Sequence, residues 1–249
     1  MKENLIRQAY EIAKERYAAI GVDVDKAMDT LQKISLSLHC WQADDVAGFE
    51  SNGSLSGGIQ ATGNYPGKAR NIDEVRQDVL KAASYLPGTH RLNLHEIYGD
   101  FQGKFVDRDQ VDVSYFESWI QWAAENKMKL DFNSTSFSHP KSGNLSLANP
   151  DKAIRDFWVE HTVRCRAIAE EMGKRQNDPC IMNIWVHDGS KDITVNRMLY
   201  RELLKDSLDR IFATEYKNMK DCIESKVFGI GLESYTEVQT IFISATVSA

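Results

Sequence analysis

Side chains that could bind a metal ion and a sugar stand at or near the ends of five short apolar segments. The first segment ends in His39-Cys40-Trp41, the second in His95-Glu96, the fourth in Trp185-Val186-His187-Asp188 and the fifth in Glu233, while the third carries Asn133. Carboxylate oxygens together with an imidazole suit Mn²⁺, Mg²⁺ or Zn²⁺. Aromatic faces pack against the C–H edges of a sugar, and histidines and carboxylates bind its hydroxyls. The set therefore predicts a site for a divalent metal and a polyol.

Each of these side chains also has a purely structural interpretation. His39 alternates with apolar neighbours, so a core histidine and a ligand are equally consistent with the pattern. His95 and Glu96 stand at the very end of a strand-like segment, where a buried polar group needs a reason to be there, and a functional role is favoured. Trp41 and Trp185 are also explained by packing between strands and helices, and the sequence alone slightly prefers that role.

Three further candidates divide between function and turn or surface positions. Glu233 follows the apolar stretch Gly229–Leu232, which favours a metal-ligand role. His187-Asp188 opens a His-Asp-Gly-Ser sequence that is equally good turn chemistry. His161 lies midway along a helical segment beside Glu160 and is predicted to be on the surface.

The apolar segments that carry these side chains have the length and alternation of β-strands. In the first of them the apolar residues Leu36, Leu38 and Cys40 alternate with polar ones, which is the period of a strand. The predicted strands are Ile34–Trp41, Arg91–Ile97, Lys129–Phe137, Ile181–Val186 and Val227–Glu233.

Helical segments precede and separate the predicted strands. Asn71 caps one of them, Asp73 and Glu74 occupy its first turn, and Pro87-Gly88 ends it. The predicted helices are Met1–Tyr17, Val24–Lys33, Asn71–Leu86, Val113–Asn126, Asp151–Gly173 and Thr194–Lys220. The alternation predicts an α/β protein with a parallel sheet, and functional groups at the C-terminal ends of its strands predict a (β/α) barrel.

The barrel pattern is incomplete. A closed barrel of this kind needs eight strands, and five are counted here, preceded by an N-terminal helical extension. The segment from Asp44 to Ala69 is a long glycine-rich connection, which is typical of a lid or a binding loop. The sequence therefore predicts one domain that comprises about the first five strands of a TIM barrel.

Composition and charge exclude several classes of protein. The 249 residues carry a net charge of −6 that is spread along the chain, so no basic face is expected to bind nucleic acid. The segment Met1–Tyr17 is a charged surface helix and not a signal peptide, and no window is apolar enough to span a bilayer. The cysteines lack CxxC spacing. A cytoplasmic protein with reduced thiols, no membrane contact and no nucleic-acid partner is expected.

Five longer motifs resemble those of L-rhamnose isomerase, and they occur in the order of that family. The resemblance covers Met1 to about Thr236. The motifs are Ser56–Arg70, Leu92–Glu96, Leu130–Thr135, Asn183–Ser190, and Phe228–Gly231 with Glu233–Thr236.

The resemblance implies a (β/α)₈ barrel, a homotetramer and a pair of divalent metals, typically manganese, with Zn²⁺ or Co²⁺ as alternatives. It implies the interconversion of L-rhamnose and L-rhamnulose, in which the metals polarise two substrate oxygens. Carried over by motif, Glu233 would be the first ligand of the structural metal. His95, Trp185 and Trp41 would line the sugar site.

The chain departs from the family after its fifth predicted strand. The family's remaining metal ligands come from later strands, and one carboxylate cannot hold a divalent ion against water. We therefore expect a partial barrel domain over residues 1–236 and a divergent tail over residues 237–249, consistent with a shifted reading frame near Thr236. Two alternatives stay open: another metal-dependent sugar isomerase or epimerase on the same barrel, and a non-catalytic sugar-binding or assembly fragment.

Overall fold

The computed structural model describes residues 2–39, 48–50, 69–189 and 196–225. Two of the predicted site residues, Trp41 and Glu233, lie outside these ranges. The same holds for the predicted strand Val227–Glu233 and for the predicted tail, residues 237–249. The expectations for the first four strands and for all the helices can be compared with the structure.

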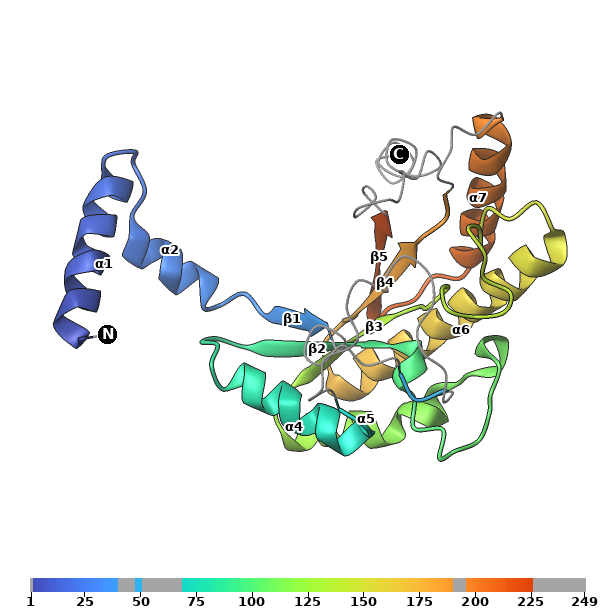
Figure 1. Ribbon diagram of the computed structural model, residues 1–249, viewed down its shortest axis with the longest axis horizontal. Coiled ribbons are helices and arrows are strands. Elements are labelled where there is room, and N and C mark those ends of the chain that lie inside the picture. The colour runs from blue at the N-terminus through green and yellow to red at the C-terminus, as the bar shows by residue number, and fades with distance from the viewer. Residues whose placement is uncertain (1, 40–47, 51–68, 190–195, 226–249) are drawn as a thin grey trace.

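Five parallel strands form a single sheet whose spatial order equals their order in the chain (Figure 1). The first four confirm the predicted strands. The strands are β1 (Leu36–His39), β2 (His90–His95), β3 (Lys129–Asn133), β4 (Cys180–Val186) and β5 (Met219–Ser225).

Strand β5 corrects the prediction of a helix from Thr194 to Lys220. The helix ends at Ile211, and the first residues of β5 occupy the end of the predicted helix. Arg166 binds the carbonyl oxygens of Ile211 and Thr214, so these oxygens accept hydrogen bonds from a side chain and not from a further helical turn. The backbone beyond them pairs with β4, and this tertiary pairing outweighs local propensity.

The helices confirm the predicted elements, and apart from the end of α7 their bounds agree with the predicted ones to within four residues. Asp23, Asn71 and Asp151 each cap a helix by accepting a backbone N–H. The helices are α1 (Glu3–Ala18), α2 (Val24–Leu31), α4 (Ile72–Ala83), α5 (Glu117–Glu125), α6 (Lys152–Gln176) and α7 (Arg197–Ile211), with 3₁₀ turns η1 (Glu96–Tyr98), η2 (Arg108–Gln110) and η3 (Val113–Phe116).

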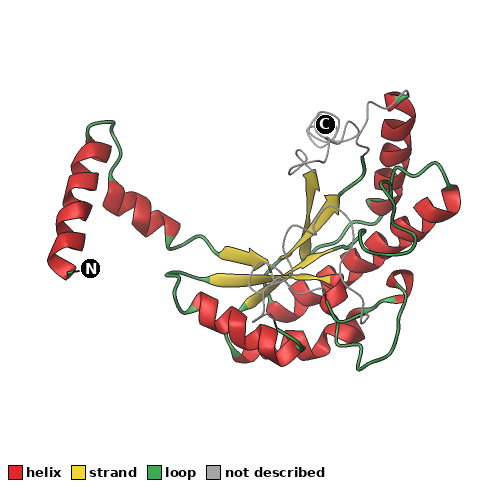
Figure 2. Cartoon of the chain, viewed as in Figure 1, coloured by secondary structure: helices red, strands yellow, loops and turns green. Residues whose placement is uncertain are grey.

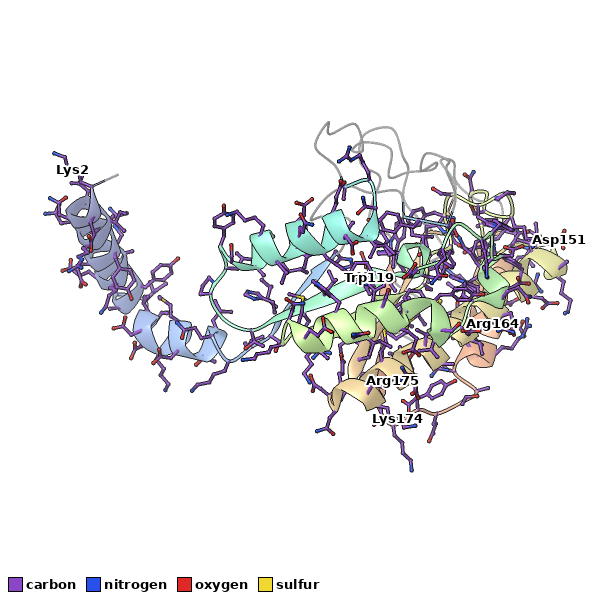
Figure 3. The ribbon with its side chains drawn as sticks, turned by 90° about the horizontal axis from the view of Figure 1, so that it is seen from below. Lys2, Trp119, Asp151, Arg164, Lys174 and Arg175 are labelled. Carbon is purple, nitrogen blue, oxygen red and sulfur yellow. The ribbon has the colours of Figure 1, made fainter. Side chains whose placement is uncertain are left out.

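The hydrophobic core lies between the sheet and the helices. Helices α4, α5 and α6 lie along one side of the sheet, with α7 beside α6 (Figure 2). Leu94 of β2 and Phe132 of β3 are fully buried, and Phe132 meets Phe116 edge to face at 4.9 Å between ring centroids. The guanidinium carbon of Arg76 of α4 lies 4.7 Å from the ring centroid of Trp119 of α5, which is labelled in Figure 3. Alternate strand residues thus supply this layer.

The other face of the sheet is polar. At the amino-terminal ends of the strands, Asp131 of β3 accepts two hydrogen bonds from Arg91 of β2, at 2.9 Å from Nε and 2.8 Å from Nη2. The same carboxylate accepts the Ser37 hydroxyl of β1 at 2.7 Å and the Ile181 N–H of β4 at 2.8 Å. One buried carboxylate therefore ties four of the strands together.

The N-terminal helices confirm the predicted helical extension. Helices α1 and α2 stand away from the sheet (Figure 1) and contain no buried residue. They contact each other through Asp25, which accepts hydrogen bonds of 2.6 Å from Tyr10 and from Lys14. In the described part of the chain, no helix combines the length and apolar character needed to cross a membrane.

Candidate functional site

The side chains predicted to do chemistry meet at the carboxyl-terminal ends of the parallel strands. His95 closes β2 and pairs in register with Asn133 of β3, which in turn pairs with Asn183 of β4. Trp185 pairs with Glu224 of β5. Because residues that pair in register project to the same face of a sheet, these side chains share the polar face. This end of a parallel sheet is where α/β proteins place their ligands.

His95 is fully buried at this end of the sheet. Its Nδ1 lies 3.2 Å from the Thr135 hydroxyl, and its ring centroid lies 5.9 Å from that of His39. Burial, together with the charges of His39 and Arg108, holds the pKa of His95 well below its ordinary value. The ring is therefore neutral at pH 7 and carries one donor and one acceptor nitrogen, as a hydroxyl ligand requires.

Trp185 reaches the same region through an intervening aromatic ring. Phe137 meets Trp185 at 5.3 Å and His95 at 6.3 Å between centroids, both near edge-to-face. Trp185 itself is half-buried. The structure thus brings His95 and Trp185, two of the predicted sugar-site residues, into one contiguous group in which Phe137 is the shared neighbour.

His39 joins this group from β1, and burial lowers its pKa. His187 lies beyond Trp185, with Nδ1 at 3.1 Å from the Ser136 hydroxyl and Nε2 at 3.2 Å from the Gly143 carbonyl. Asp188 is fully buried and accepts the Ser146 hydroxyl at 2.5 Å. The His187-Asp188 pair therefore anchors the loop that precedes α6. The predicted His-Asp-Gly-Ser turn extends to Ser190, which lies outside the described residues, and stays a prediction.

Glu224 was missed by sequence reasoning. It lies near the end of β5 and accepts a hydrogen bond of 2.7 Å from the Asn183 amide. The sequence places no strand there, so nothing marks this carboxylate as facing the site. The face to which Glu224 projects is set by the register that pairs Met219 with Cys180, and this register exists only in the folded sheet.

His161 corrects the prediction of a surface histidine, because its side chain is fully buried. Its Nε2 accepts the Thr135 N–H at 3.0 Å, and its Nδ1 donates to the Arg108 carbonyl at 3.0 Å. Burial and the Arg108 charge lower the pKa of His161 to about 3. The neighbouring Glu160 suggested solvent, but the helical spacing from Trp158 to His161 to Cys165 marks a buried stripe and could have revealed it.

Arg108 is the second residue that the sequence did not reveal. Its guanidinium is buried and donates to the carbonyl oxygens of Thr135 and Phe137, each at 2.6 Å. It also pairs with Glu50, whose Oε2 accepts from Nε at 3.0 Å. No motif around η2 distinguishes this arginine from a surface one, so only the fold identifies it.

Glu96 follows His95 and is fully buried beside Arg108, with 3.7 Å between Oε2 and Nε. Neither carboxylate oxygen has a hydrogen-bond partner among the described residues. Burial raises the pKa of Glu96 to about 8 against the attraction of Arg108, and the negative charge of Glu50 acts in the same direction as burial. The Glu96 carboxyl is therefore largely protonated at pH 7.

Replacing Glu96 with glutamine is expected to stabilise the chain at pH 8 and to change it little near pH 5. The folded protein holds the Glu96 proton to about pH 8, whereas an unfolded chain releases it near pH 4.3. The folded state binds more protons between these values, so the free energy of unfolding of the parent falls as pH rises through the window. Urea unfolding of both chains at pH 5, 6, 7 and 8 measures this.

The expected gain at pH 8 is on the order of a few kcal/mol, since each pH unit of the window corresponds to about 1.4 kcal/mol. A stability difference between Glu96→Gln and the parent that stays constant from pH 5 to pH 8 would contradict the raised pKa.

The described residues do not fit a divalent metal site. Within them, no group of three or more His, Cys, Asp or Glu side chains is placed to hold an ion. Glu224 and His39 face the same end of the sheet, but these two side chains offer too few ligands on their own.

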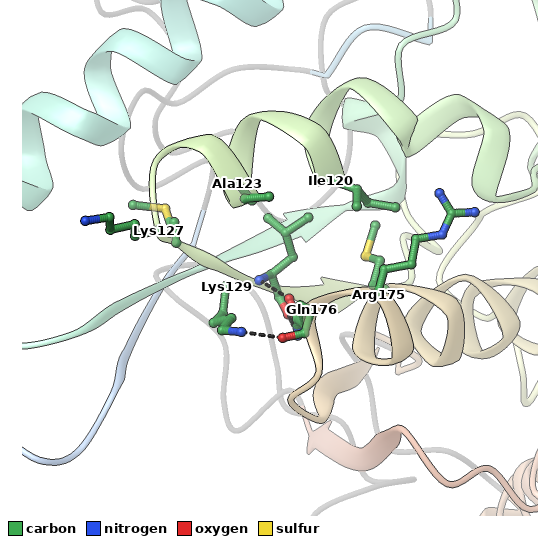
Figure 4. A pocket seen from close by; sticks show the side chains of 10 residues that line it. Ile120, Ala123, Lys127, Lys129, Arg175 and Gln176 are labelled. Carbon is green, nitrogen blue, oxygen red and sulfur yellow. Dashed lines mark hydrogen bonds between the residues drawn. The ribbon is translucent and has the colours of Figure 1, made fainter.

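A cavity of about 380 Å³ lies elsewhere, between α5 and α6 (Figure 4). Ile120 and Ala123 line it from α5 and Arg175 from α6, and Gln176 closes it by accepting the Leu130 N–H at 2.8 Å. It opens beside Leu130, near the amino-terminal end of β3, on the side of the sheet away from His95. Ligands of parallel α/β folds do not bind at that end, so this cavity is not part of the candidate site.

Comparison with known proteins gives one consistent result. The family model of L-rhamnose isomerase (RhaA) matches residues 4–247. An L-rhamnose isomerase of Bacteroides thetaiotaomicron is 79% identical over 236 residues, which cover 94% of this chain and 56% of the relative. Those of Rhodopirellula baltica and Mannheimia succiniciproducens are 52% and 49% identical, over 92% and 96% of this chain and 55% and 58% of the relatives.

The chain spans about half the length of the curated relatives it matches. Identity of 79% across nearly all of the chain, together with a family model that matches residues 4–247, leaves no other assignment. The chain belongs to the L-rhamnose isomerase family.

Proposed function

We propose that this chain supplies the sugar-contacting half of an enzyme that interconverts the aldose L-rhamnose and the ketose L-rhamnulose. One observation carries the proposal. A buried, neutral His95 stands beside the aromatic pair Phe137 and Trp185 at the carboxyl-terminal ends of parallel strands, in a member of this family. The aromatic rings present an apolar wall to the C–H face of a sugar, and the imidazole offers a donor and an acceptor to its hydroxyls.

We also propose the parts of the site that lie outside the described residues. Trp41 would extend the aromatic wall, and Glu233 would be the first ligand of a divalent metal, with Mn²⁺ preferred and Zn²⁺ or Co²⁺ as substitutes. The metal would act as a Lewis acid on the sugar oxygens.

The sheet belongs in this proposal to a (β/α)₈ barrel. The order β1-β2-β3-β4-β5 supports it, because each new strand adds beside the last, whereas a doubly wound sheet reverses its order at a switch point. Residues 1–236 would form the partial barrel domain, and the full-length protein would be a cytoplasmic homotetramer that acts on sugars and not on nucleic acid or membranes.

A chimera tests the proposed activity. Residues 1–236 of this chain are joined to the remaining C-terminal part of the Bacteroides thetaiotaomicron relative, and the purified protein is assayed with L-rhamnose and Mn²⁺. We expect L-rhamnulose to form. Failure with L-rhamnose, combined with turnover of another aldose, would favour a different sugar isomerase. Sugar binding that does not depend on metal, without turnover, would favour a non-catalytic binding protein.

Within the chimera, His95→Ala is expected to lower kcat/KM for L-rhamnose by about 10- to 100-fold, the cost of a substrate hydroxyl left without its partner. His90→Ala is the matched control, since His90 stands at the amino-terminal end of the same strand. We expect that control to change kcat/KM little. Equal losses in the two variants would show that His95 acts only through the stability of β2.

A further inference from the structure

The segment formed by residues 134–138, between β3 and α6, stands between the two described sugar-site candidates. Its Thr135 hydroxyl lies 3.2 Å from Nδ1 of His95. Its Phe137 ring contacts both His95 and Trp185. The segment therefore contacts both side chains and limits the orientations that they can adopt on their strands.

Arg108 holds the segment by its backbone. Nη1 donates to the carbonyl oxygens of Thr135 and Phe137, both at 2.6 Å, and Nη2 lies 3.4 Å from that of Ser138. These carbonyls follow the end of β3, where the ladder no longer supplies donors. A guanidinium suits the task, because its five N–H groups are fixed in one plane and it stays charged.

His161 binds a fourth backbone group of the same segment. Its Nε2 accepts the Thr135 N–H, and its Nδ1 bonds the carbonyl oxygen of Arg108 itself, both at 3.0 Å. An amide N–H can only donate and a carbonyl can only accept, so the two bonds require one neutral tautomer with the proton on Nδ1. His161 therefore links the segment to Arg108, which also binds it.

The buried charge of Arg108 is balanced from a different loop. Glu50 binds both Nε and Nη2 of the guanidinium. The ring of Trp158 lies 5.9 Å from the guanidinium carbon. A buried arginine with a bidentate carboxylate and two short bonds to carbonyls has little freedom to change its rotamer. The arrangement of Arg108 and His161 around residues 134–138 is thus a fixed part of the fold.

We propose that Arg108 and His161 are positioning residues, which hold residues 134–138 so that His95 and Trp185 keep their relative placement. In this proposal neither side chain contacts the sugar. The inference rests on the proposed function only for its description of the site as a sugar site. Its geometric content concerns this chain alone.

Fluorine NMR of the 249-residue chain labelled with 5-fluorotryptophan tests the inference without any need for catalysis. The Trp185 resonance is assigned with Trp185→Phe. Trp119 reports on the overall fold, because it is fully buried, bonds the Tyr98 carbonyl at 2.8 Å and lies under the guanidinium of Arg76 of α4. The Trp158 resonance is set aside, since Trp158 contacts Arg108 directly.

Three variants are compared with the parent. Arg108→Gln and His161→Ala are expected to shift or broaden the Trp185 resonance and to leave that of Trp119 in place. His161→Gln keeps an acceptor within reach of the Thr135 N–H and is expected to restore most of the parent Trp185 signal. The matched control is Arg164→Gln, which removes a partly exposed arginine of α6 (Figure 3) and should change neither resonance.

A Trp185 resonance that stays in place in both Arg108→Gln and His161→Ala would overturn the inference. So would a Trp119 resonance that moves as far as that of Trp185 in all three variants, because the change would then be global. In the active chimera, Arg108→Gln is expected to lower kcat/KM by about 10²-fold, as misplacement of a site by about 1 Å does. An inactive chimera with the fluorine result intact would defeat the proposed function and support the positioning role.

Discussion

Replacing Gly173 with alanine is expected to lower the free energy of unfolding by about 3 kcal/mol or more, from overpacking against the backbone. In an exposed helix interior the same change stabilises by about 1 kcal/mol. Here a Cβ would stand 1.7 Å from the Asn218 carbonyl oxygen and 3.0 Å from the Cys180 amide nitrogen. These two backbone groups bond each other at 3.0 Å at the start of the β4–β5 pairing. Neither can move without opening that pairing.

Urea unfolding of the 249-residue chain, followed by circular dichroism, measures the effect. Gly143→Ala is the control, because a Cβ there meets no heavy atom within 4 Å. We expect the control to change stability by less than about 0.5 kcal/mol, as surface substitutions do. A Gly173→Ala chain as stable as the parent would mean that β5 does not dock against α6 as described.

Asp131→Ala is expected to lower the free energy of unfolding by about 3–5 kcal/mol, the range found when one partner of a buried ion pair is removed. The side chain of Asp131 is 1% exposed and that of Arg91 is 10% exposed, so the remaining guanidinium would be largely cut off from water. Asp178 would keep one contact with Arg91 at 2.5 Å, but its side chain is 42% exposed and belongs to a loop. The hydroxyl of Ser37 and the N–H of Ile181 would also lose their acceptor.

The double variant Asp131→Leu with Arg91→Met removes both charges. It therefore separates the cost of leaving Arg91 unpaired from the cost of burying the ion pair itself. It is expected to be markedly more stable than Asp131→Ala, since replacing both partners of a buried pair by apolar residues is often neutral or stabilising. The exposed pair of Glu3 and Arg7 supplies the comparison, and Glu3→Ala should cost less than about 1 kcal/mol. A loss below 1 kcal/mol for Asp131→Ala would show that the carboxylate is not a shared tie between strands.

The sequence predicts the strand-end position of His95 because a polar residue that closes an apolar, alternating run can be seen in one dimension. The same holds for Trp185. Arg108 and His161 escape this logic, because their importance comes from backbone groups more than 20 residues away that they meet only after β3 and α6 have packed. The helical spacing from Trp158 to His161 could have predicted that His161 is buried, but the charged neighbour Glu160 led to the prediction of a surface position.

Strand β5 shows a related limit. Met219–Ser225 contains two charged residues in its first three positions after methionine and has no apolar run to mark it. It becomes a strand because β4 offers an open ladder and because Asp221 pairs with Arg166 of α6 at 2.8 Å. Glu224 could not be recognised as a site residue, because the strand that carries it was not predicted. The predicted strand Val227–Glu233 lies outside the described residues and stays a prediction.

Arg108 and His161 bind residues 134–138 through main-chain atoms, which every amino acid except proline shares. The side chains of Thr135 and Phe137 can therefore be replaced while these main-chain bonds are kept. Evolution or a directed library can reshape the wall beside His95 at two codons, exchanging a ring for a smaller or more polar group, without disturbing the arginine and histidine behind it. In the proposed sugar site, selectivity can change at these two positions while the fold stays fixed.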